Sequence, residues 1–184
     1  MESPCLELVN SEVWYGLGPL EDLLLGQPGW LDGFVSRWEL SPIAGPTNRQ
    51  LAELVRLRSL LRRLVDGLAA GQSPTEADLR ELNAFLASRP VSRQVARTAS
   101  GHRMELVPAR RDWRWVLSEI AASFGELLST GETARIKVCQ NPECRWAFYD
   151  ESKNRKRRWC DPAICGNRDK VRRFRSRQQA DRTR

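Results

Sequence analysis

The amino-acid sequence predicts an α+β protein in two parts: a helix-dominated N-terminal domain with a β-hairpin, then a small unit of a knuckle, a hairpin and a basic helix. Three observations support this. Several stretches before residue 130 repeat apolar residues at helical spacing, two β-like runs flank a turn, and four of the five cysteines lie within residues 139–165. We place the boundary in the segment TGETA, giving domains at residues 1–133 and 134–184.

The first helices are predicted from apolar stripes and the residues that cap them. The segment PGWLDGFVSRWEL, residues 28–40, repeats large apolar side chains at helical spacing. Residues 47–71 give the longest stripe, with Thr47 and Gln50 placed as a capping box and Gly71 placed to end the helix. Helical spacing favours a core role over a ligand pocket for five tryptophans: Trp14, Trp30, Trp38, Trp113 and Trp115.

Two more helices are framed by the same kinds of residue. The segment SPTEADLRELNAFLA is expected to begin with Ser73 as N-cap, followed by Pro74 in the first turn and Glu76 as the capping-box acid. The segment after Asp112 has an apolar side that runs to Gly131, which suits a helix end. The first domain is therefore mostly helical.

A β-hairpin is predicted between these two helices. The runs RQVART and HRMELV, residues 93–98 and 102–107, are β-like and flank the segment ASG, which places Gly101 in the turn. His102 is the only histidine and is expected to be a half-exposed residue of this hairpin. A histidine-based catalytic pair is therefore excluded.

The cysteines form two pairs, Cys139 with Cys144 and Cys160 with Cys165, each with four residues between its members. Asn-Pro follows shortly after the first cysteine of one pair and Asp-Pro after that of the other, so both pairs are expected on turns. In a reducing cytosol, clustered cysteines are metal ligands more often than disulfides, and four thiolates suit one structural zinc ion. Free core cysteines or a redox pair are the alternatives, but redox pairs usually read C-x-x-C, which is absent here.

Between the cysteine pairs, alternation predicts a short strand, with Trp146 and Phe148 on one face and Ala147 and Tyr149 on the other. The segment RKRRW is expected to return as the second strand, and the residues after Cys165 to form a basic helix. This order gives a treble-clef-like zinc finger. Because so small a unit has little core of its own, we expect a chelator to unfold it and to spare the helical domain.

Positive charge is concentrated at the C-terminal end. Residues 135–184 contain 16 Lys or Arg and 6 Asp or Glu, a net charge of +10, whereas the remainder carries −3. This asymmetry points to an anionic partner, most often nucleic acid. The candidate contacts are Arg155, Lys156, Arg157, Arg158, Asn167, Arg168, Lys170, Arg172, Arg173, Arg175 and Arg177.

These motifs resemble two known families. Residues 135–177 resemble the CGNR zinc finger, whose four-letter name corresponds here to Cys165, Gly166, Asn167 and Arg168. The segments CLELVNSEVW and LRELNAFLA resemble motifs of the ABATE domain, described as a putative stress-induced transcription regulator, with Asn10-Ser11 where the usual motif reads Asn-Thr. The resemblance implies a bacterial, zinc-containing regulator that binds DNA. Both residues also have structural interpretations: Asn167 as a helix cap and Gly166 as a residue with positive φ.

Three functions follow from these features. We expect a cytoplasmic DNA-binding transcription regulator, whose N-terminal domain senses a signal or forms a homodimer. The alternatives are an RNA- or ribosome-associated zinc protein that stacks Trp146, Phe148 and Trp159 on unpaired bases, and a protein-interaction module. We expect no enzyme, because four cysteines leave zinc no open position. We also expect no membrane span, because no run approaches about 20 apolar residues.

Overall fold

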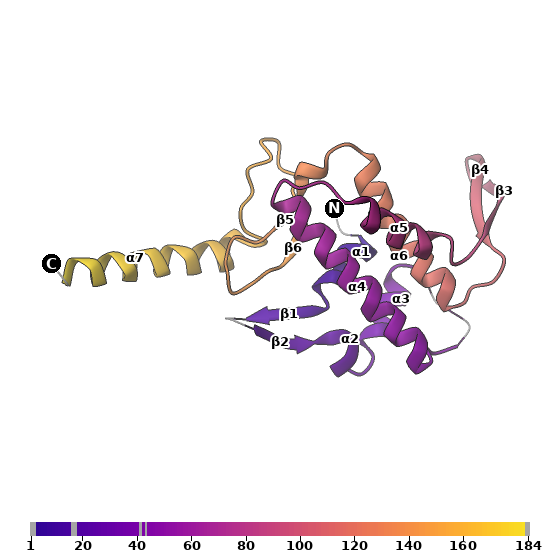
Figure 1. Cartoon of the computed structure of the whole chain (residues 1–184). Coiled ribbons are helices and arrows are strands. Elements are labelled where there is room, and N and C mark those ends of the chain that lie inside the picture. Colours follow the sequence, from indigo (N-terminus) through magenta and orange to yellow (C-terminus); the bar gives the residue numbers. More distant parts are fainter. Residues whose placement is uncertain (1–2, 16–17, 41, 43, 183–184) are drawn as a thin grey trace.

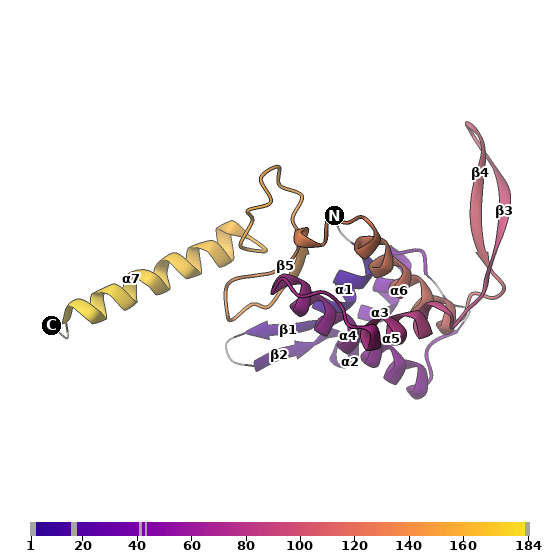
Figure 2. The same cartoon turned by 45° about the horizontal axis from the view of Figure 1, so that its top comes forward.

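The computed structural model describes residues 3–15, 18–40, 42 and 44–182, and it confirms the α+β class. Residues 1–2 and 183–184, the outer ends of the two expected domains, lie outside the described residues. A helical body is built from α1 (Pro4–Asn10), α4 (Asn48–Ala69), α5 (Glu76–Leu86) and α6 (Trp113–Ser129). The helix α7 (Asn167–Arg182) projects from one end of this body and the hairpin of β3 (Val91–Thr98) and β4 (Gly101–Pro108) from the other (Figures 1 and 2).

The smaller elements complete the chain. They are β1 (Glu12–Tyr15), β2 (Gly18–Asp22), α2 (Leu23–Gly26), α3 (Trp30–Arg37), the short helix η1 (Thr133–Arg135), β5 (Ile136–Val138), β6 (Ala147–Tyr149) and the wide helical turn η2 (Pro162–Gly166). In the described part of the chain, no helix combines the length and the apolar character needed to cross a bilayer.

The main core lies around α4. Its buried apolar side consists of Leu54, Leu57, Leu60, Leu61, Leu64 and Val65. The helices α1, α5 and α6 and the strand β5 all contact α4. Burying one such side chain contributes about 1.5–3 kcal/mol to the stability of the fold. The elements that pack on α4 are therefore held mainly through this apolar side. Of the five tryptophans, Trp113 and Trp115 are buried and Trp30 and Trp38 pack against the core.

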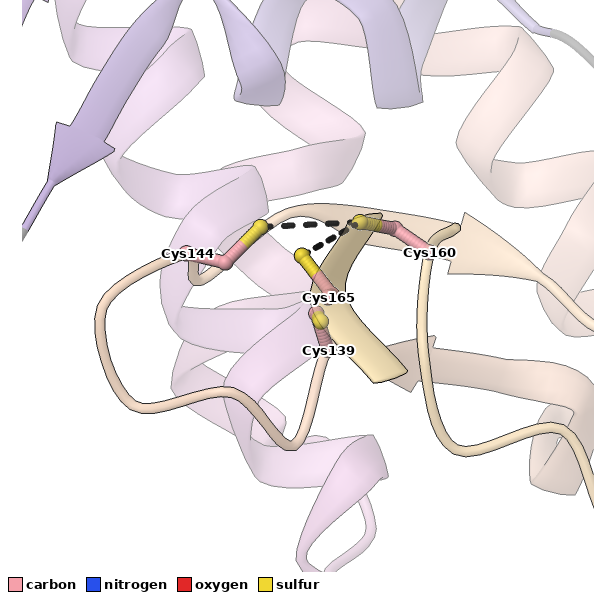
Figure 3. A group of neighbouring side chains, drawn as sticks. All are labelled: Cys139, Cys144, Cys160 and Cys165. Carbon is pink, nitrogen blue, oxygen red and sulfur yellow. Dashed lines mark hydrogen bonds between the residues drawn. The ribbon is translucent and has the colours of Figure 1, made fainter. Parts of the chain in front are cut away.

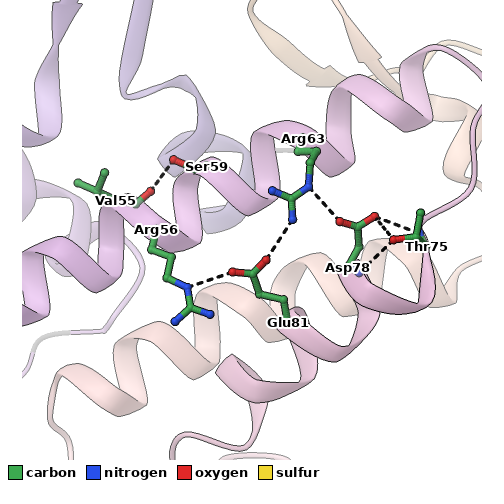
Figure 4. Close-up of polar contacts among 7 residues, drawn as sticks. All are labelled: Val55, Arg56, Ser59, Arg63, Thr75, Asp78 and Glu81. Atoms are coloured by element: carbon green, nitrogen blue, oxygen red, sulfur yellow. Dashed lines mark hydrogen bonds and ion pairs between the residues drawn. The ribbon is translucent and has the colours of Figure 1, made fainter.

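The long helix begins as predicted, but the next helix begins later than predicted. Thr47 and Gln50 form the capping box of α4. The N-cap of α5 is Thr75, whose hydroxyl accepts a hydrogen bond from the backbone of Asp78, so the prediction of Ser73 was wrong. The physical reason is a capping box: the carboxylate of Asp78 reaches back to the backbone N–H of Thr75, and it also pairs with Arg63 of α4 at 2.9 Å (Figure 4). Figure 4 also shows Glu81 between Arg63 and a second arginine of α4, which fastens the two helices together.

Two hairpins precede the cysteine-rich segment. The predicted one is confirmed: Thr98 pairs with Gly101, whose φ is 139°, so the turn itself consists of Ala99 and Ser100. The hairpin of β1 and β2 was not predicted. It ends at Asp22, which is the N-cap of α2 and also makes a bidentate ion pair with the buried Arg58.

The third hairpin uses a different partner strand from the predicted one. β6 pairs antiparallel with β5, which precedes the first cysteine, and the segment RKRRW at residues 155–159 is an irregular loop. The cause is the buried carboxylate of Asp150, which accepts hydrogen bonds from the side chain of Lys137 and the backbone N–H of Arg157. These bonds hold the returning chain beside β5 without forming a ladder.

Candidate metal centre

Four cysteines from separate segments meet at the junction between the helical body and α7 (Figure 3). Cys139 directly follows β5, and Cys144 lies in the loop that leads to β6. Cys160 ends the irregular loop, and Cys165 lies in η2, immediately before α7. The cluster therefore joins the ends of four chain segments and fixes the start of the basic helix.

The sulfur positions fit a tetrahedral ion. All four Sγ atoms lie within 4.8 Å of one another. The Sγ atom of Cys160 is 3.5 Å from that of Cys144 and 3.6 Å from that of Cys165. Zinc bound to thiolates at about 2.3 Å sets the sulfurs of a tetrahedron about 3.8 Å apart. These residues thus form a closed site for one structural Zn²⁺.

Backbone turns and a buried amide support the ligands. The backbone N–H of Cys144 donates to the carbonyl oxygen of Asn141 at 3.0 Å, which closes the first predicted knuckle. The side chain of Asn141 is buried, and its Nδ2 atom lies 3.7 Å from Sγ of Cys165, so it donates to a ligand sulfur. At the second predicted turn, the carboxylate of Asp161 accepts from two backbone N–H groups of η2. Such outer contacts orient the ligands and tune their basicity.

The crowded thiols perturb one another. Hydrogen bonds from Cys144 and then Cys160 lower the pKa of Cys139 to about 2. The contact with Cys139 in turn raises the pKa of Cys144 to about 12, and it raises the pKa of Cys160 as well. The Cys139 thiolate therefore accepts hydrogen bonds from its neighbours, and the charge of a bound divalent cation favours the ionised form of Cys144 and Cys160 as well.

Gly166 is required by a close contact, which corrects the expectation of a positive φ. The residue has no positive φ, but a Cβ atom placed on it would lie 2.9 Å from Cδ1 and 3.2 Å from Nε1 of Trp159. The ring of Trp159 packs on the cysteine cluster beside Phe148. Gly166 thus lets the indole of Trp159 approach η2 closely, next to the ligand Cys165.

Replacing Gly166 by alanine is expected to destabilise the zinc site. The added methyl group must push aside a ring packed on the cluster, which costs about 1–3 kcal/mol. The measurement is zinc affinity by competition with a chromophoric chelator, together with the thermal unfolding midpoint. Gly125→Ala in α6 is the matched control, because no neighbouring group lies within 4 Å of the position that its methyl carbon would take, and alanine favours a helix. Equal zinc affinity in the two variants would contradict this role.

The predicted nucleic-acid contacts on α7 fall into two groups. Arg172 and Arg173 both pair with the buried carboxylate of Asp169, and Arg172 also reaches the side chain of Asn141 at 3.4 Å. Asn167 donates from Nδ2 to the carbonyl oxygen of Ala163 at 2.7 Å, which is a structural contact but not the predicted helix cap. Arg172 thus links α7 to the knuckle at Asn141, whereas the pairs with Asp169 lie within the helix itself and Asn167 bonds back to η2. The candidates exposed along the rest of α7 are Arg168, Lys170, Arg175 and Arg177.

The candidates in the irregular loop also make internal contacts. The guanidinium of Arg157 lies 4.7 Å from the ring centre of Phe148 and donates to the carbonyl oxygen of Trp159. That of Arg158 lies 4.8 Å from the ring centre of Trp159, and Arg155 pairs with Glu132. Lys156 is exposed. A role of these four residues in nucleic-acid binding stays a prediction.

The sequence reasoning missed how the cysteine module is joined to the helical body. The buried side chain of Asn10 accepts from the backbone N–H of Ala147 and donates to its carbonyl oxygen, both at 2.8 Å. Arg62 of α4 donates to the carbonyl oxygen of Arg145, whose own guanidinium pairs with Asp66. A polar residue in the otherwise apolar end of CLELVN was the available signal.

Apolar packing also joins the cysteine module to the helical body. Ile136, Ala147 and Tyr149 belong to the main core, whereas Phe148 faces the cysteines, so the predicted alternation along β6 is confirmed for these side chains. The two parts thus share one core through β5 and β6. We therefore revise the expectation that a chelator would spare the helical body.

Two family models match the chain. Residues 135–178 match the model described as the CGNR zinc finger. Residues 2–131 match the ABATE model, described as "Putative stress-induced transcription regulator". No curated protein sequence matches the chain. The boundary placed between residues 133 and 134 stays a prediction.

Proposed function

We propose that this chain, which belongs to the ABATE family of putative stress-induced transcription regulators and carries a CGNR zinc finger, acts by binding duplex DNA through α7. The observation that carries the proposal is the form of this helix. It has seven Lys or Arg and two Asp, a net charge of +5, and it projects from the body with its first turn held by the cysteine cluster (Figure 1).

Exposure and anchoring are what a phosphate-binding helix needs. An α-helix fits the major groove, and cations along it release counterions from the duplex. Val171 and Phe174 are exposed at 48% and 61%, so α7 does not use them to pack on the body. The start of α7 directly follows the ligand Cys165, and Arg172, which Asp169 holds, reaches Asn141 of the cysteine module, so the helix is anchored at its N-terminal end.

The RNA-binding alternative receives less support from the aromatic residues. It needs exposed rings on which unpaired bases can stack. Phe148 is buried, and Trp159 packs on the cysteine cluster under the guanidinium of Arg158. Of the three rings considered, Trp146 at 43% is the exposed one. We therefore place DNA first and RNA second.

A cavity at the junction supports a sensing role for the N-terminal part. It has a volume of about 620 Å³ and lies between α1, α3 and β6. Trp30 and Arg37 line it from the helical body, and Trp146, Tyr149 and Arg157 line it from the zinc module. We propose that a small effector bound there would bias the placement of the finger. We propose no catalysis, because four thiolates close the zinc, and we propose a cytoplasmic location, where DNA is accessible.

The proposal predicts a specific loss when charge is removed from α7. The double variant Arg175→Gln with Arg177→Gln avoids the residues that anchor the helix. Each lost phosphate contact lowers the slope of log K against log salt by about 0.9, so the slope should become shallower by about 1.8 for all duplex sequences. The measurement is fluorescence anisotropy with duplexes selected from a random pool, with single-stranded RNA as competitor.

The matched control removes the same charge from the helical body. Arg49→Gln with Arg80→Gln replaces two exposed arginines of α4 and α5 and should leave the slope unchanged. If the α7 variant binds like this control, α7 is not the DNA-binding element. If RNA displaces every duplex, the RNA alternative replaces the proposal.

A further inference from the structure

The β3–β4 hairpin is an arm whose residues contribute little to the core. Figures 1 and 2 show it standing away from the helices, at the end of the body opposite α7. Val95, Met104 and Leu106 are exposed at 66%, 64% and 62%. Eight residue pairs link the two strands from Val91↔Pro108 to Thr98↔Gly101, so the arm is a regular two-stranded ribbon.

The strand register places these apolar side chains on one face together with cations. Val95 lies opposite Met104, and Arg93 lies opposite Leu106. Arg97 lies opposite His102, two residues further along the same face. The acidic Glu105 pairs with Gln94 and belongs to the other face. This face therefore combines an apolar stripe with positive charge alone.

The whole segment that carries the arm is basic within an acidic domain. Residues 89–111 contain six arginines and one glutamate, a net charge of +5, whereas the rest of residues 1–134 carries −8. Two of the arginines have partners at the base of the arm: Arg89 pairs with Asp112, and Arg111 stacks on Trp115. Arg93 and Arg97 are exposed on the arm itself. The arm is thus a second, separate concentration of arginine.

The charge on this face decides between an anionic partner and a second copy of the chain. Packing two copies through it would bury Arg93 and Arg97 against like charges with no acid on the same face, which is costly. A polyanion compensates these charges. A two-stranded ribbon also has the width that a DNA groove accepts, and arginine is favoured in a narrow minor groove. Apolar side chains at a ribbon tip then contact sugars, thymine methyl groups or base steps.

We propose that the β3–β4 arm is a second DNA-contacting element, which lies in a groove of the same duplex that α7 binds. The inference rests on the proposed function and extends it from the zinc finger to the N-terminal domain. Because the arm and α7 project from opposite ends of the body, they contact separate stretches of the duplex. The protein therefore covers a longer site than one helix would.

The test measures salt dependence and footprint in the full-length, zinc-loaded protein. A duplex selected from a random pool is the probe, and the variants are Arg93→Gln with Arg97→Gln, and Val95→Thr with Met104→Thr. The arginine variant should make the salt slope shallower by about 1.8, weaken binding on the order of tenfold at physiological salt, and shorten the hydroxyl-radical footprint at one end. The apolar variant should weaken binding without changing the slope. Zinc content and thermal midpoint confirm that each variant is folded.

The other outcomes overturn the inference in distinguishable ways. If both arm variants bind like Arg49→Gln with Arg80→Gln while the α7 variant is weakened, α7 binds DNA and the arm does not. If sedimentation shows a dimer that Val95→Thr with Met104→Thr converts to a monomer, and the slope per protomer is unchanged, the arm is a subunit interface. If the wild type binds no duplex, the proposed function and the arm's role both fail.

Discussion

A Cys160→Ser variant is expected to lose zinc and to weaken the helical body as well as the finger. Cys160 lies at hydrogen-bond distance from two other ligand sulfurs, so its loss opens the site. Zinc binding contributes on the order of 10–16 kcal/mol in small finger peptides, comparable to the whole stability of a domain. Without it, β5 and β6 lose their fixed placement, and Ile136, Ala147 and Tyr149 no longer fill the main core.

The expected loss of stability follows mainly from Ile136 and Tyr149, because Ala147 contributes only a methyl group. Removing large apolar groups from a core costs about 2–5 kcal/mol each, and partial collapse recovers some of this. A net loss of about 3–5 kcal/mol in the unfolding free energy of the body lowers its thermal midpoint by roughly 10 °C. Hydrogen exchange should rise in α4 and α1, which contact β5 and β6. Calorimetry and metal analysis measure both effects.

Cys5→Ser provides the control for a buried cysteine that is not a ligand. Cys5 is fully buried, and its sulfur lies 3.3 Å from the hydroxyl of Ser3, so a serine retains a hydrogen-bond partner there. This variant should keep one zinc per chain and a folded finger. Wild type treated with a chelator should recover when zinc is returned, whereas Cys160→Ser should not. A zinc-free protein whose helical body melts at the wild-type temperature would show that the two parts are independent.

The contrast between predicted and observed features has a physical pattern. Local signals were reliable: the capping box at Thr47, the hairpin with Gly101, and the cysteine knuckle at Asn141 each depend on residues close in sequence. The wrong N-cap at Ser73 arose because two capping signals stand two residues apart, Ser73 with Glu76 and Thr75 with Asp78, and the second one forms. Capping preferences alone do not rank two such neighbours, and the pair between Asp78 and Arg63 of α4 adds a contact between helices that they do not contain.

The cysteine module shows the same division. Its ligands and the alternation along β6 follow from spacing and period. The partner of β6 did not, because strands of three residues leave weak patterns and the buried Asp150 determines where the returning loop lies. Burial by itself would raise the pKa of Asp150, but hydrogen bonds from Lys137 and Ser152 outweigh it and hold the pKa well below its usual range. An ionised buried carboxylate with several donors is a tertiary feature.

Replacing Asn10 by alanine is expected to be the most costly polar substitution in the helical body. Its amide satisfies both the N–H and the carbonyl oxygen of Ala147, a residue that is 1% exposed. Alanine leaves both groups buried without a partner, and each unmet group costs about 1–3 kcal/mol. The free energy of unfolding should therefore fall by about 2–5 kcal/mol. Asn83→Ala, at an exposed position of α5, is the control and should change it by less than about 0.5 kcal/mol.

The neighbouring Ser11 explains why this motif tolerates the departure from Asn-Thr. Its hydroxyl donates to the carbonyl oxygen of Leu8 and accepts from the buried Arg58, and a threonine hydroxyl can make the same two bonds. Ser11→Thr should therefore be nearly neutral, whereas no other side chain reproduces both bonds of the Asn10 amide. Chemical denaturation of the three variants measures these differences directly.

Asn10→Asp tests whether the donor or the acceptor of this amide matters more. The aspartate keeps an acceptor for the N–H of Ala147 but, when ionised, faces its carbonyl oxygen without a proton to donate. Burial raises the folded-state pKa of this carboxyl, so its stabilising form is complete below about pH 3.9 and is lost as pH rises through the raised value. The variant should therefore lie closest to wild type at the lowest pH at which both proteins keep their zinc, and fall toward Asn10→Ala at neutral pH. A pH-independent difference from wild type would show that the carbonyl of Ala147 finds another donor, and that Asn10 is not what joins the zinc module to the helical body.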